Sequence, residues 1–182
     1  MSCLYVISGS SGVGKGTVIR EFLAKHQNFK LSVSCTTRAP RPREIDGKDY
    51  FFISRETFDE YVKNDEFIEH AEFSGNCYGT RKKFVQDCLD KGENVILEID
   101  TQGAFQIKEK MPEAVLIFMV PPSFEILEQR LRNRGTETEE AIQKRLAQVK
   151  REMESSYMFD YTLENDTIEN AVSALEEITN AK

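Results

Sequence analysis

The chain has 182 residues, 40% hydrophobic and 30% charged, which is typical of one globular domain and excludes a disordered or collagen-like chain. Its formal net charge of −7 disfavours a general binder of nucleic acids. The acidic surplus lies at one end, since residues 152–182 hold eight acids and one base whereas residues 1–151 hold 23 of each. We therefore expect no nucleic-acid partner. Two local clusters of bases, at 30–43 and 130–134, are either solvated faces or sites for small anionic ligands.

The first elements in the chain are a strand, a glycine-rich turn and a helix. Residues 4–8 are rich in β-forming side chains, and apolar residues then recur at helical spacing over 18–23. Two further apolar runs precede segments with helical spacing: 95–99 before 102–110, and 114–120 before 123–133. Near-continuous apolar strands separated by helices are typical of a parallel sheet covered on both faces. We expect an α/β fold of this kind.

Two segments depart from this alternation. The first, residues 31–78, is rich in Thr, aromatic residues, Pro and charges, with one helix near 56–63, and indicates an inserted α+β lobe. In the second, Thr136 and Glu139 have the spacing of a capping box ahead of a long, highly charged helix, which we expect to form an exposed lid. A strand at 161–163 and a helix at 168–178 follow. We predict a single domain, 1–182, made of a core (1–32, 83–133 and 153–182), the lobe (33–82) and the lid (134–152).

The four cysteines, Cys3, Cys35, Cys77 and Cys88, form no C-x-x-C pair and no zinc-site spacing with the two histidines. We expect them to be reduced thiols of a cytoplasmic protein. The N-terminus has no positively charged leader, and the longest strictly apolar stretch, 114–120, is far shorter than the roughly 18 residues of a membrane span. We therefore expect a soluble protein with no membrane partner.

The turn after the first strand carries a phosphate-binding pattern. The string Gly9-Ser-Ser-Gly-Val-Gly-Lys-Gly-Thr17 contains G-x-x-x-x-G-K between a predicted strand and a predicted helix. Its glycines let backbone N–H groups turn inward around phosphate oxygens, the helix N-terminus adds its positive end, and Lys15 reaches the β and γ phosphates. The predicted nucleoside triphosphate site comprises Gly9, Ser10, Ser11, Gly12, Val13, Gly14, Lys15, Gly16 and Thr17.

One position departs from the strict pattern. Gly16 stands where a Ser or Thr normally offers a hydroxyl to magnesium, and Thr17 follows one place later. The G-K-G-T form resembles nucleoside monophosphate kinases, and the resemblance implies Mg²⁺ held largely by water and phosphate oxygens. Thr17 and Asp100 are the candidate protein ligands of the metal.

Four motifs then occur in order within the inserted segment. They are Ser32-Val-Ser-Cys-Thr-Thr-Arg-Ala-Pro-Arg41, Gly47-Lys-Asp-Tyr-Phe-Phe52, Phe67-Ile-Glu-His70 and Phe73-Ser-Gly-Asn-Cys-Tyr-Gly-Thr80. Here the sequence resembles the guanylate kinase family, over essentially the whole chain. The resemblance implies a P-loop NTPase core with a parallel sheet, a GMP-binding lobe and a helical lid. It also implies that GMP is bound by Ser34, Arg38, Arg41, Tyr50, Glu69, Tyr78, Gly79 and Thr80, with Glu98 and Asp100 beside them.

The residue types in the lobe fit this implication chemically. Arg38 and Arg41, separated by a proline turn and with no neighbouring acid, can form bidentate pairs with a monophosphate. Guanine presents N1–H and N2–H₂ donors that a carboxylate such as Glu69 accepts, beside an O6 acceptor for hydroxyls such as Ser34 and Thr80. Adenine would leave Glu69 unpaired, and buried mismatches of this kind give selectivity of about 10⁴ or more. Any one of these residues alone would more often be a surface or packing residue, so the set carries the prediction.

Glu98 and Asp100 close the apolar run 95–99. They alternate with Ile99, so we expect both carboxylates on the same side of the strand. Acids at the carboxyl edge of a parallel strand beside a phosphate loop normally face bound magnesium or the acceptor ribose. The resemblance implies such roles, with Asp100 favoured, while either carboxylate could instead cap the next helix.

Phosphoryl transfer needs positive charge around the moving group, because its transition state spreads negative charge over three oxygens. The candidate catalytic residues are Lys15, Arg38, Arg41, Arg134 and Arg145. Arg145 lies near the edge of the lid helix's apolar stripe and is either an inward-facing group or an ordinary exposed arginine. We place Arg134 and Asn165 with ATP, the latter because its segment resembles the family's adenine-side loop. Arg43 stands where the family commonly has glycine, and we leave it outside the site.

These features together predict a Mg²⁺-dependent enzyme that transfers the γ-phosphate of ATP to GMP, and to dGMP, for purine nucleotide metabolism, as a monomer or a homodimer. Two alternatives stay open: a non-catalytic guanylate-kinase-like interaction domain, and another small-molecule kinase on the same fold. The intact Lys15 disfavours the first, and the base-reading residues Glu69 and Thr80 disfavour the second. The sequence has no N-K-x-D string, so it gives no support to a G-protein-like switch.

Overall fold

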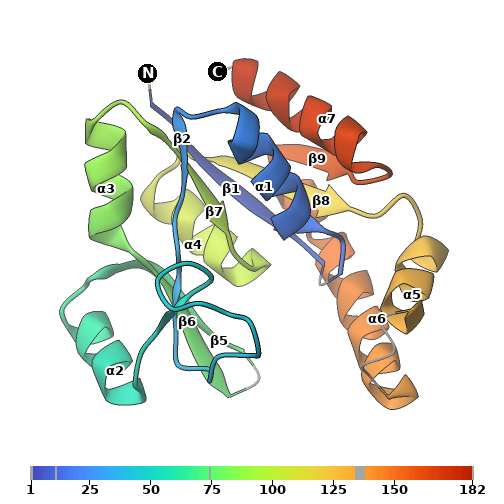
Figure 1. Ribbon diagram of the computed structural model, residues 1–182, viewed down its shortest axis with the longest axis horizontal. Helices are drawn as coiled ribbons and strands as arrows, with labels where there is room; N and C mark the ends of the chain where they lie inside the picture. Colours follow the sequence, from blue (N-terminus) through green and yellow to red (C-terminus); the bar gives the residue numbers. More distant parts are fainter. Residues whose placement is uncertain (1, 11, 74, 134–137, 182) are drawn as a thin grey trace. The chain divides into compact units, whose positions relative to one another are not determined.

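Strands and helices alternate along the chain in the computed structural model, which describes residues 2–10, 12–73, 75–133 and 138–181 (Figure 1). The strands are β1 (Leu4–Gly9), β2 (Phe29–Leu31), β3 (Cys35–Thr36), β4 (Phe51–Phe52), β5 (Phe67–Phe73), β6 (Asn76–Arg81), β7 (Asn94–Glu98), β8 (Val115–Val120) and β9 (Tyr161–Glu164). The helices are α1 (Lys15–Lys25), α2 (Arg55–Lys63), α3 (Lys82–Asp90), α4 (Thr101–Lys110), α5 (Phe124–Asn133), α6 (Glu139–Glu154), the 3₁₀ helix η1 (Ser156–Met158) and α7 (Ile168–Asn180).

The chain divides into two compact units. The first comprises Met1–Tyr5, Asn28–Leu97 and Gln102–Ala114, and the second comprises Val6–Gln27, Glu98–Thr101 and Val115–Lys182. The predicted division into core, lobe and lid follows different boundaries and stays a prediction.

Five strands form a sheet in the order β2-β7-β1-β8-β9. β2 pairs with β7, and β8 with β9, in parallel. Residues 115–119 of β8 are all buried, with at most 2% of each exposed, as expected for a strand covered on both faces. The predicted strands at 4–8, 95–99 and 114–120 are β1, β7 and β8, and the predicted helices after the last two are α4 and α5. The α/β prediction is therefore confirmed.

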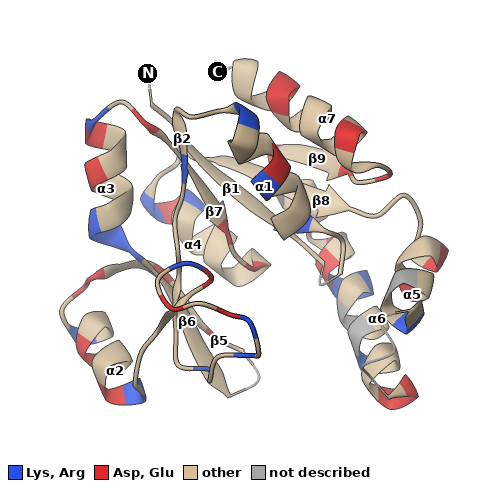
Figure 2. Ribbon diagram, in the orientation of Figure 1, with Lys and Arg blue, Asp and Glu red and all other residues tan. Residues whose placement is uncertain are grey.

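The two helices at the ends of the second unit, α1 and α7, pack side by side (Figure 1). His26, which follows α1, stacks on Phe22 and lies 3.0 Å from Glu176 of α7. Figure 2 shows acidic residues along α7, and Glu169 and Glu177 there are exposed. Part of the C-terminal charge surplus is thus a solvated helix face.

The inserted segment forms a second sheet, in the order β4-β3-β6-β5, within the first unit. β6 pairs antiparallel with β3 and with β5, whereas β3 and β4 are parallel. Ser54 caps α2 by accepting a hydrogen bond from the Thr57 N–H (3.1 Å), and Phe58 of this helix packs on Phe67 of β5. An α+β lobe with one helix at the predicted position is therefore confirmed.

Helix α6, which occupies the predicted lid segment, begins later than predicted. Thr138, and not Thr136, is the N-cap of α6, and its hydroxyl accepts the Ala141 N–H (3.3 Å). Both threonines suit an N-cap, and the acid three residues after Thr136 favoured the wrong one; Thr136 itself lies outside the described residues. The predicted apolar stripe is confirmed and packs on α5: Ile142, Leu146 and Val149 are buried with Leu127 and Leu131.

All four cysteines are free thiols, as predicted. Burial raises the pKa of Cys35, Cys77 and Cys88, so these thiols stay protonated at neutral pH. Within the described ranges, no helix combines the length and the apolar character needed to cross a bilayer.

Candidate functional site

The phosphate loop connects β1 to the first turn of α1 in the second unit. Gly14 is the N-cap of α1 with a φ of 99°, and Gly9 has a φ of 140°. A Cβ at Gly9 would lie 2.3 Å from the carbonyl oxygen of Met119, so only glycine fits there. The Val13 N–H donates to the carbonyl of Ser10 (3.2 Å), which curls the loop on itself. The predicted strand, glycine loop and helix are therefore present, with the helix N-terminus at the end of the loop.

Lys15 folds back over this loop. Its Nζ donates to the carbonyl oxygens of Gly9 (2.6 Å) and Ser10 (3.3 Å). Desolvation by burial lowers the pKa of Lys15, and the nearby carboxylates of Glu98, Glu152 and Asp100 oppose that shift. A cationic amine held over a ring of backbone groups is suited to phosphate oxygens.

The Ser10 hydroxyl adds a second polar group to the loop. Ser10 is fully buried, and its Oγ has no hydrogen-bond partner among the described residues. Buried hydroxyls without a partner are uncommon, so this atom is suited to a ligand oxygen or a water.

Glu98 and Asp100 both lie near Lys15, since each acts on its pKa. β7 ends at Glu98, so Asp100 follows the strand, just before α4, and the predicted strand alternation does not extend to it. Solvent reaches the Glu98 side chain, yet protein atoms crowd its carboxylate, and this desolvation raises the pKa of Glu98 more than Lys15 lowers it. The prediction placed both acids on one side of a strand. In the structure, Asp100 lies near Lys15 because the chain turns into α4 after Ile99.

The donor set here suits a magnesium ion that keeps most of its water. No group of three or more His, Cys, Asp or Glu side chains in the described ranges could hold a metal. Mg²⁺ is commonly bound through one or two carboxylates together with waters and substrate phosphates, so Glu98 and Asp100 beside the loop fit that pattern. A Cβ at Gly16 would lie 3.5 Å from Glu98 Oε2, in ordinary contact, so space does not exclude a side chain at this position.

Asn165 lies behind the phosphate loop. Its Nδ2 donates to the carbonyl of Val13 (2.6 Å), its own N–H donates to Val120 (2.8 Å), and it is 5% exposed. Asn165 therefore links β8 and β9 to the loop and supports it, a role that the sequence did not indicate. Its predicted contact with adenine stays a prediction.

Three predicted groups cannot be placed. Ser11 and Arg134 lie outside the described residues, and Arg145 belongs to α6 without a described side chain. Their roles stay predictions.

In the first unit, Arg38 has an acidic partner, contrary to the prediction that no acid neighbours the arginine pair. Its Nη1 and Nη2 donate to Glu44 Oε2 (3.0 Å) and Oε1 (2.8 Å), and Glu44 also accepts the Arg41 N–H (2.7 Å). The acid-free stretch on which the prediction rests ends at Arg43, and the turn from Arg41 to Glu44 brings the next residue, an acid, back to Arg38. The side chain of Arg41 is exposed.

The predicted tyrosines lie beside Arg38. The guanidinium carbon is 5.4 Å from the centre of the Tyr50 ring, and the rings of Tyr50 and Tyr78 are 6.0 Å apart. The Glu44 carboxylate, with a smaller contribution from Tyr78, raises the pKa of Arg38. Three of the residues predicted to bind GMP, Arg38, Tyr50 and Tyr78, are therefore neighbours in the structure.

Arg43 occupies the left-handed region, with a φ of 77°. Glycine adopts this conformation without strain, whereas a residue with a Cβ does not. The unusual arginine is therefore part of the turn that returns Glu44 to Arg38. The signal was present in the sequence as an arginine where the resembled family commonly has glycine.

The two predicted base readers form a buried pair. Thr80 Oγ1 donates to Glu69 Oε1 (2.5 Å), and Glu69 and Thr80 are 3% and 0% exposed. They face each other across β5 and β6 because the register shifts between Phe67 and Glu69. A Cβ at Gly79 would lie 2.9 Å from Phe67 Cδ1, so Gly79 lets the two strands pack.

Ser34, the other predicted hydroxyl, precedes β3 and is half-buried. Its carbonyl accepts the Phe51 N–H (2.9 Å), which ties it to β4. The predicted contact of its hydroxyl with O6 stays a prediction.

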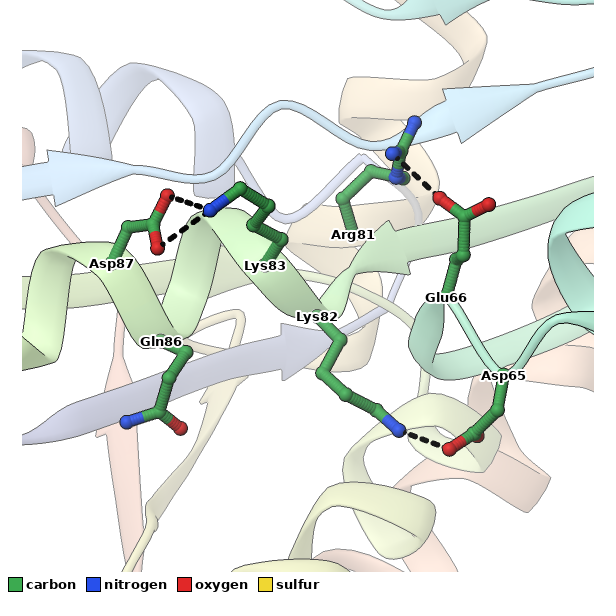
Figure 3. Close-up of a pocket in the computed structure, with 7 residues that line it drawn as sticks. All are labelled: Asp65, Glu66, Arg81, Lys82, Lys83, Gln86 and Asp87. Atoms are coloured by element: carbon green, nitrogen blue, oxygen red, sulfur yellow. Dashed lines mark hydrogen bonds and ion pairs between the residues drawn. The ribbon is translucent and has the colours of Figure 1, made fainter.

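A hollow of about 410 Å³ lies elsewhere, at the start of α3 (Figure 3). Figure 3 shows its charges in pairs: Arg81 with Glu66, Lys82 with Asp65 and Lys83 with Asp87. None of its lining residues belongs to the predicted site. Because each of these bases is paired with an acid, this hollow does not favour an anion.

A parallel sheet with a glycine loop between β1 and α1, and a lysine as the first residue of α1, defines the class of P-loop NTPases. The family model described as guanylate kinase matches residues 1–182. The chain is 48% identical over 180 residues to the guanylate kinase of Streptococcus thermophilus (98% of this chain, 86% of that one) and 49% identical over 170 residues to that of Thermus thermophilus (93% and 77%). The chain therefore belongs to the guanylate kinase family.

Solved structures agree with the assignment. The crystal structure of guanylate kinase from Anaplasma phagocytophilum matches with a TM-score of 0.82 and 38% identity, over 99% of this chain and 85% of that one. The shikimate kinase of Bacteroides thetaiotaomicron, with a TM-score of 0.53 and 16% identity over 98% of each chain, shares the fold alone.

Proposed function

We propose that this chain transfers the γ-phosphoryl group of ATP to GMP, and to dGMP, giving ADP and GDP, and so serves purine nucleotide metabolism. Family membership supports the reaction, since the matched relatives are named guanylate kinases. The observation that carries the choice of acceptor is the buried carboxylate of Glu69, fixed by Thr80. Guanine offers two adjacent donors to such a carboxylate, whereas adenine offers an acceptor at N1 and would leave it unpaired.

The roles of the residues follow from their chemistry. The phosphate of GMP is held by Arg38, Arg41, Tyr50 and Tyr78. An oxygen of this phosphate attacks the γ-phosphorus of ATP, and the bond between the γ-phosphorus and the oxygen that bridges it to the β-phosphate breaks, so that ADP leaves. Lys15 moves from the loop carbonyls to the β and γ phosphates, which offer it stronger, charge-assisted bonds. Ser34 donates to O6 of the base, and Thr80 does so once its single hydroxyl proton turns from Glu69 to O6. The lid arginines, Arg134 and Arg145, add positive charge to the transferring group.

Kinases of this kind use a divalent metal, and we propose Mg²⁺. Asp100, Glu98 and Thr17 would hold it, mainly through water, and it would neutralise charge shared between the β and γ oxygens. We also propose a cytoplasmic enzyme, monomeric or homodimeric.

A coupled assay for ADP release tests the reaction with GMP, dGMP, AMP, CMP and UMP. We expect kcat/KM for GMP to exceed that for AMP by about 10⁴-fold or more. Equal turnover of all monophosphates would overturn the choice of acceptor. ATP binding without turnover of any acceptor would favour the non-catalytic interaction domain, which the intact Lys15 disfavours.

Two variants separate the proposed roles. Glu69→Ala should lose discrimination between GMP and AMP, whereas Lys15→Ala should lower kcat by about 10²–10³-fold and leave discrimination unchanged. Small and equal effects of both substitutions would contradict these roles.

A further inference from the structure

β5 is an edge strand of the lobe sheet, since the strand order places only β6 beside it. One side of such a strand presents N–H and C=O groups that no neighbouring strand can pair. Here α4, in the same unit, supplies those partners. Gln106 Oε1 accepts the His70 N–H (3.2 Å), Gln106 Nε2 donates to the His70 carbonyl (2.8 Å), and Lys110 Nζ donates to the Ile68 carbonyl (2.6 Å).

These contacts fall on the two residues that flank Glu69. Along a strand, alternate residues direct their backbone groups to the same side, so Ile68 and His70 face α4 while Glu69 turns its backbone toward β6. The side-chain amide of Gln106 pairs with both backbone groups of His70, the N–H and the C=O, as a residue of a neighbouring strand would. Glu69 is thus held from both neighbouring positions.

The strand needs this support at Glu69 because its pairing with β6 is irregular there. The register shifts between Phe67 and Glu69, so the ladder is locally disrupted next to the residue whose carboxylate meets Thr80 at 2.5 Å. Hydrogen bonds weaken within a few tenths of an ångström, and a small slide of β5 would misalign that carboxylate.

We propose that Gln106 and Lys110 are positioning residues for guanine recognition: they take the place of a neighbouring strand along β5 and fix the carboxylate of Glu69. The inference rests on the proposed function. It assigns base selectivity in part to two α4 side chains, although the base reader itself lies on β5.

The same helix offers a matched control. Lys108 Nζ donates to the carbonyl of Ala114 (2.8 Å), beyond the end of α4, so this lysine also bonds to a backbone carbonyl, but one outside β5. A general loss of helix stability would affect Lys108→Met and Lys110→Met alike.

The test compares wild type with Gln106→Ala, Lys110→Met, Lys110→Arg and Lys108→Met, using GMP and IMP as acceptors. IMP lacks the 2-amino group of guanine and so removes one of the two donors to Glu69. We expect Gln106→Ala and Lys110→Met to raise KM for GMP by about 5–10-fold, the effect of losing roughly one hydrogen bond, with KM for ATP and kcat within about twofold. The preference for GMP over IMP should fall by a similar factor, while Lys110→Arg and Lys108→Met keep it.

An unchanged GMP to IMP ratio in Lys110→Met and Gln106→Ala would overturn the inference, and so would parallel rises of KM for ATP and GMP. If Gln106→Ala does not fold, the comparison of Lys110→Met with Lys110→Arg and Lys108→Met decides the matter. Failure of wild type to phosphorylate GMP would instead count against the proposed function, so the two failures are distinct.

Discussion

The guanidinium of Arg38 is held end-on by the carboxylate of Glu44, with N–O distances of 3.0 and 2.8 Å. The same carboxylate accepts the backbone N–H of Arg41, so it joins two residues predicted to hold one phosphate. The pairing raises the pKa of Arg38 and lowers that of Glu44, which keeps both groups charged. Arg38 Nη1 also donates to the Ala39 carbonyl (2.8 Å), so two acceptors hold the guanidinium in place.

The first prediction follows from this geometry. Glu44→Gln should raise KM for GMP by about tenfold with a smaller change in kcat, because Arg38 would have to be ordered by the ligand instead of beforehand. Steady-state kinetics with varied GMP measures it, and Glu60→Gln, an exposed acid on α2, serves as control. Tighter binding of GMP to Glu44→Gln would show that the carboxylate competes with the phosphate.

The second prediction concerns the turn that presents Glu44. Arg43 has a φ of 77°, a conformation that costs a residue with a Cβ about 1–2 kcal/mol. Glycine avoids this cost, but its unfolded chain has more conformational entropy to lose, which lowers stability by about 0.5–1 kcal/mol. Arg43→Gly should therefore raise the free energy of unfolding by about 0.5–1 kcal/mol. Denaturant unfolding tests this, with Lys48→Gly in the same loop expected to lower stability. A loss of stability in Arg43→Gly would refute it.

The secondary structure of the core could be predicted because its signals are local. The apolar runs of β1, β7 and β8 and the periodic helices after the last two depend on residues close in sequence, and their limits agree within one residue. The predicted start of α6 was wrong because two threonines offer the same capping chemistry. Only the backbone conformation shows that Thr138 is the N-cap.

The sequence predicted which residues belong to the candidate site better than it predicted which of their side chains contact one another. The pairing of Glu69 with Thr80 depends on a register shift in β5, and the hydrogen bond from Asn165 to Val13 joins residues far apart in sequence. Neither has a local pattern. Glu44 was missed because the turn through Arg43 needs a backbone conformation that arginine seldom adopts.

A third prediction uses two glycines of the phosphate loop. Gly9→Ala should abolish ATP binding and lower stability by several kcal/mol, because its Cβ would lie 2.3 Å from the Met119 carbonyl oxygen. Gly16→Ala places its Cβ 3.5 Å from Glu98 Oε2 and should stay folded and bind ATP within about threefold of wild type. Thermal melting and ATP titration of both variants measure the contrast. Equal losses of stability and ATP binding in both variants would contradict this prediction, because only Gly9→Ala creates a clash with the Met119 carbonyl.

The fourth prediction is a dependence of stability on pH. Arg38 lowers the pKa of Glu44 in the folded chain, so the unfolded chain binds more protons as the pH falls below about 4.5, the usual value for Glu. The pair therefore contributes stability that is complete above that pH and is lost as the pH falls through the folded pKa. With side chains 15% and 19% exposed, we expect wild type to exceed Glu44→Gln by about 1 kcal/mol at pH 7 and by much less at pH 3. Denaturant unfolding of both proteins across this range measures the difference, and a constant difference would mean that Glu44 stabilises the turn through its shape and not through its charge.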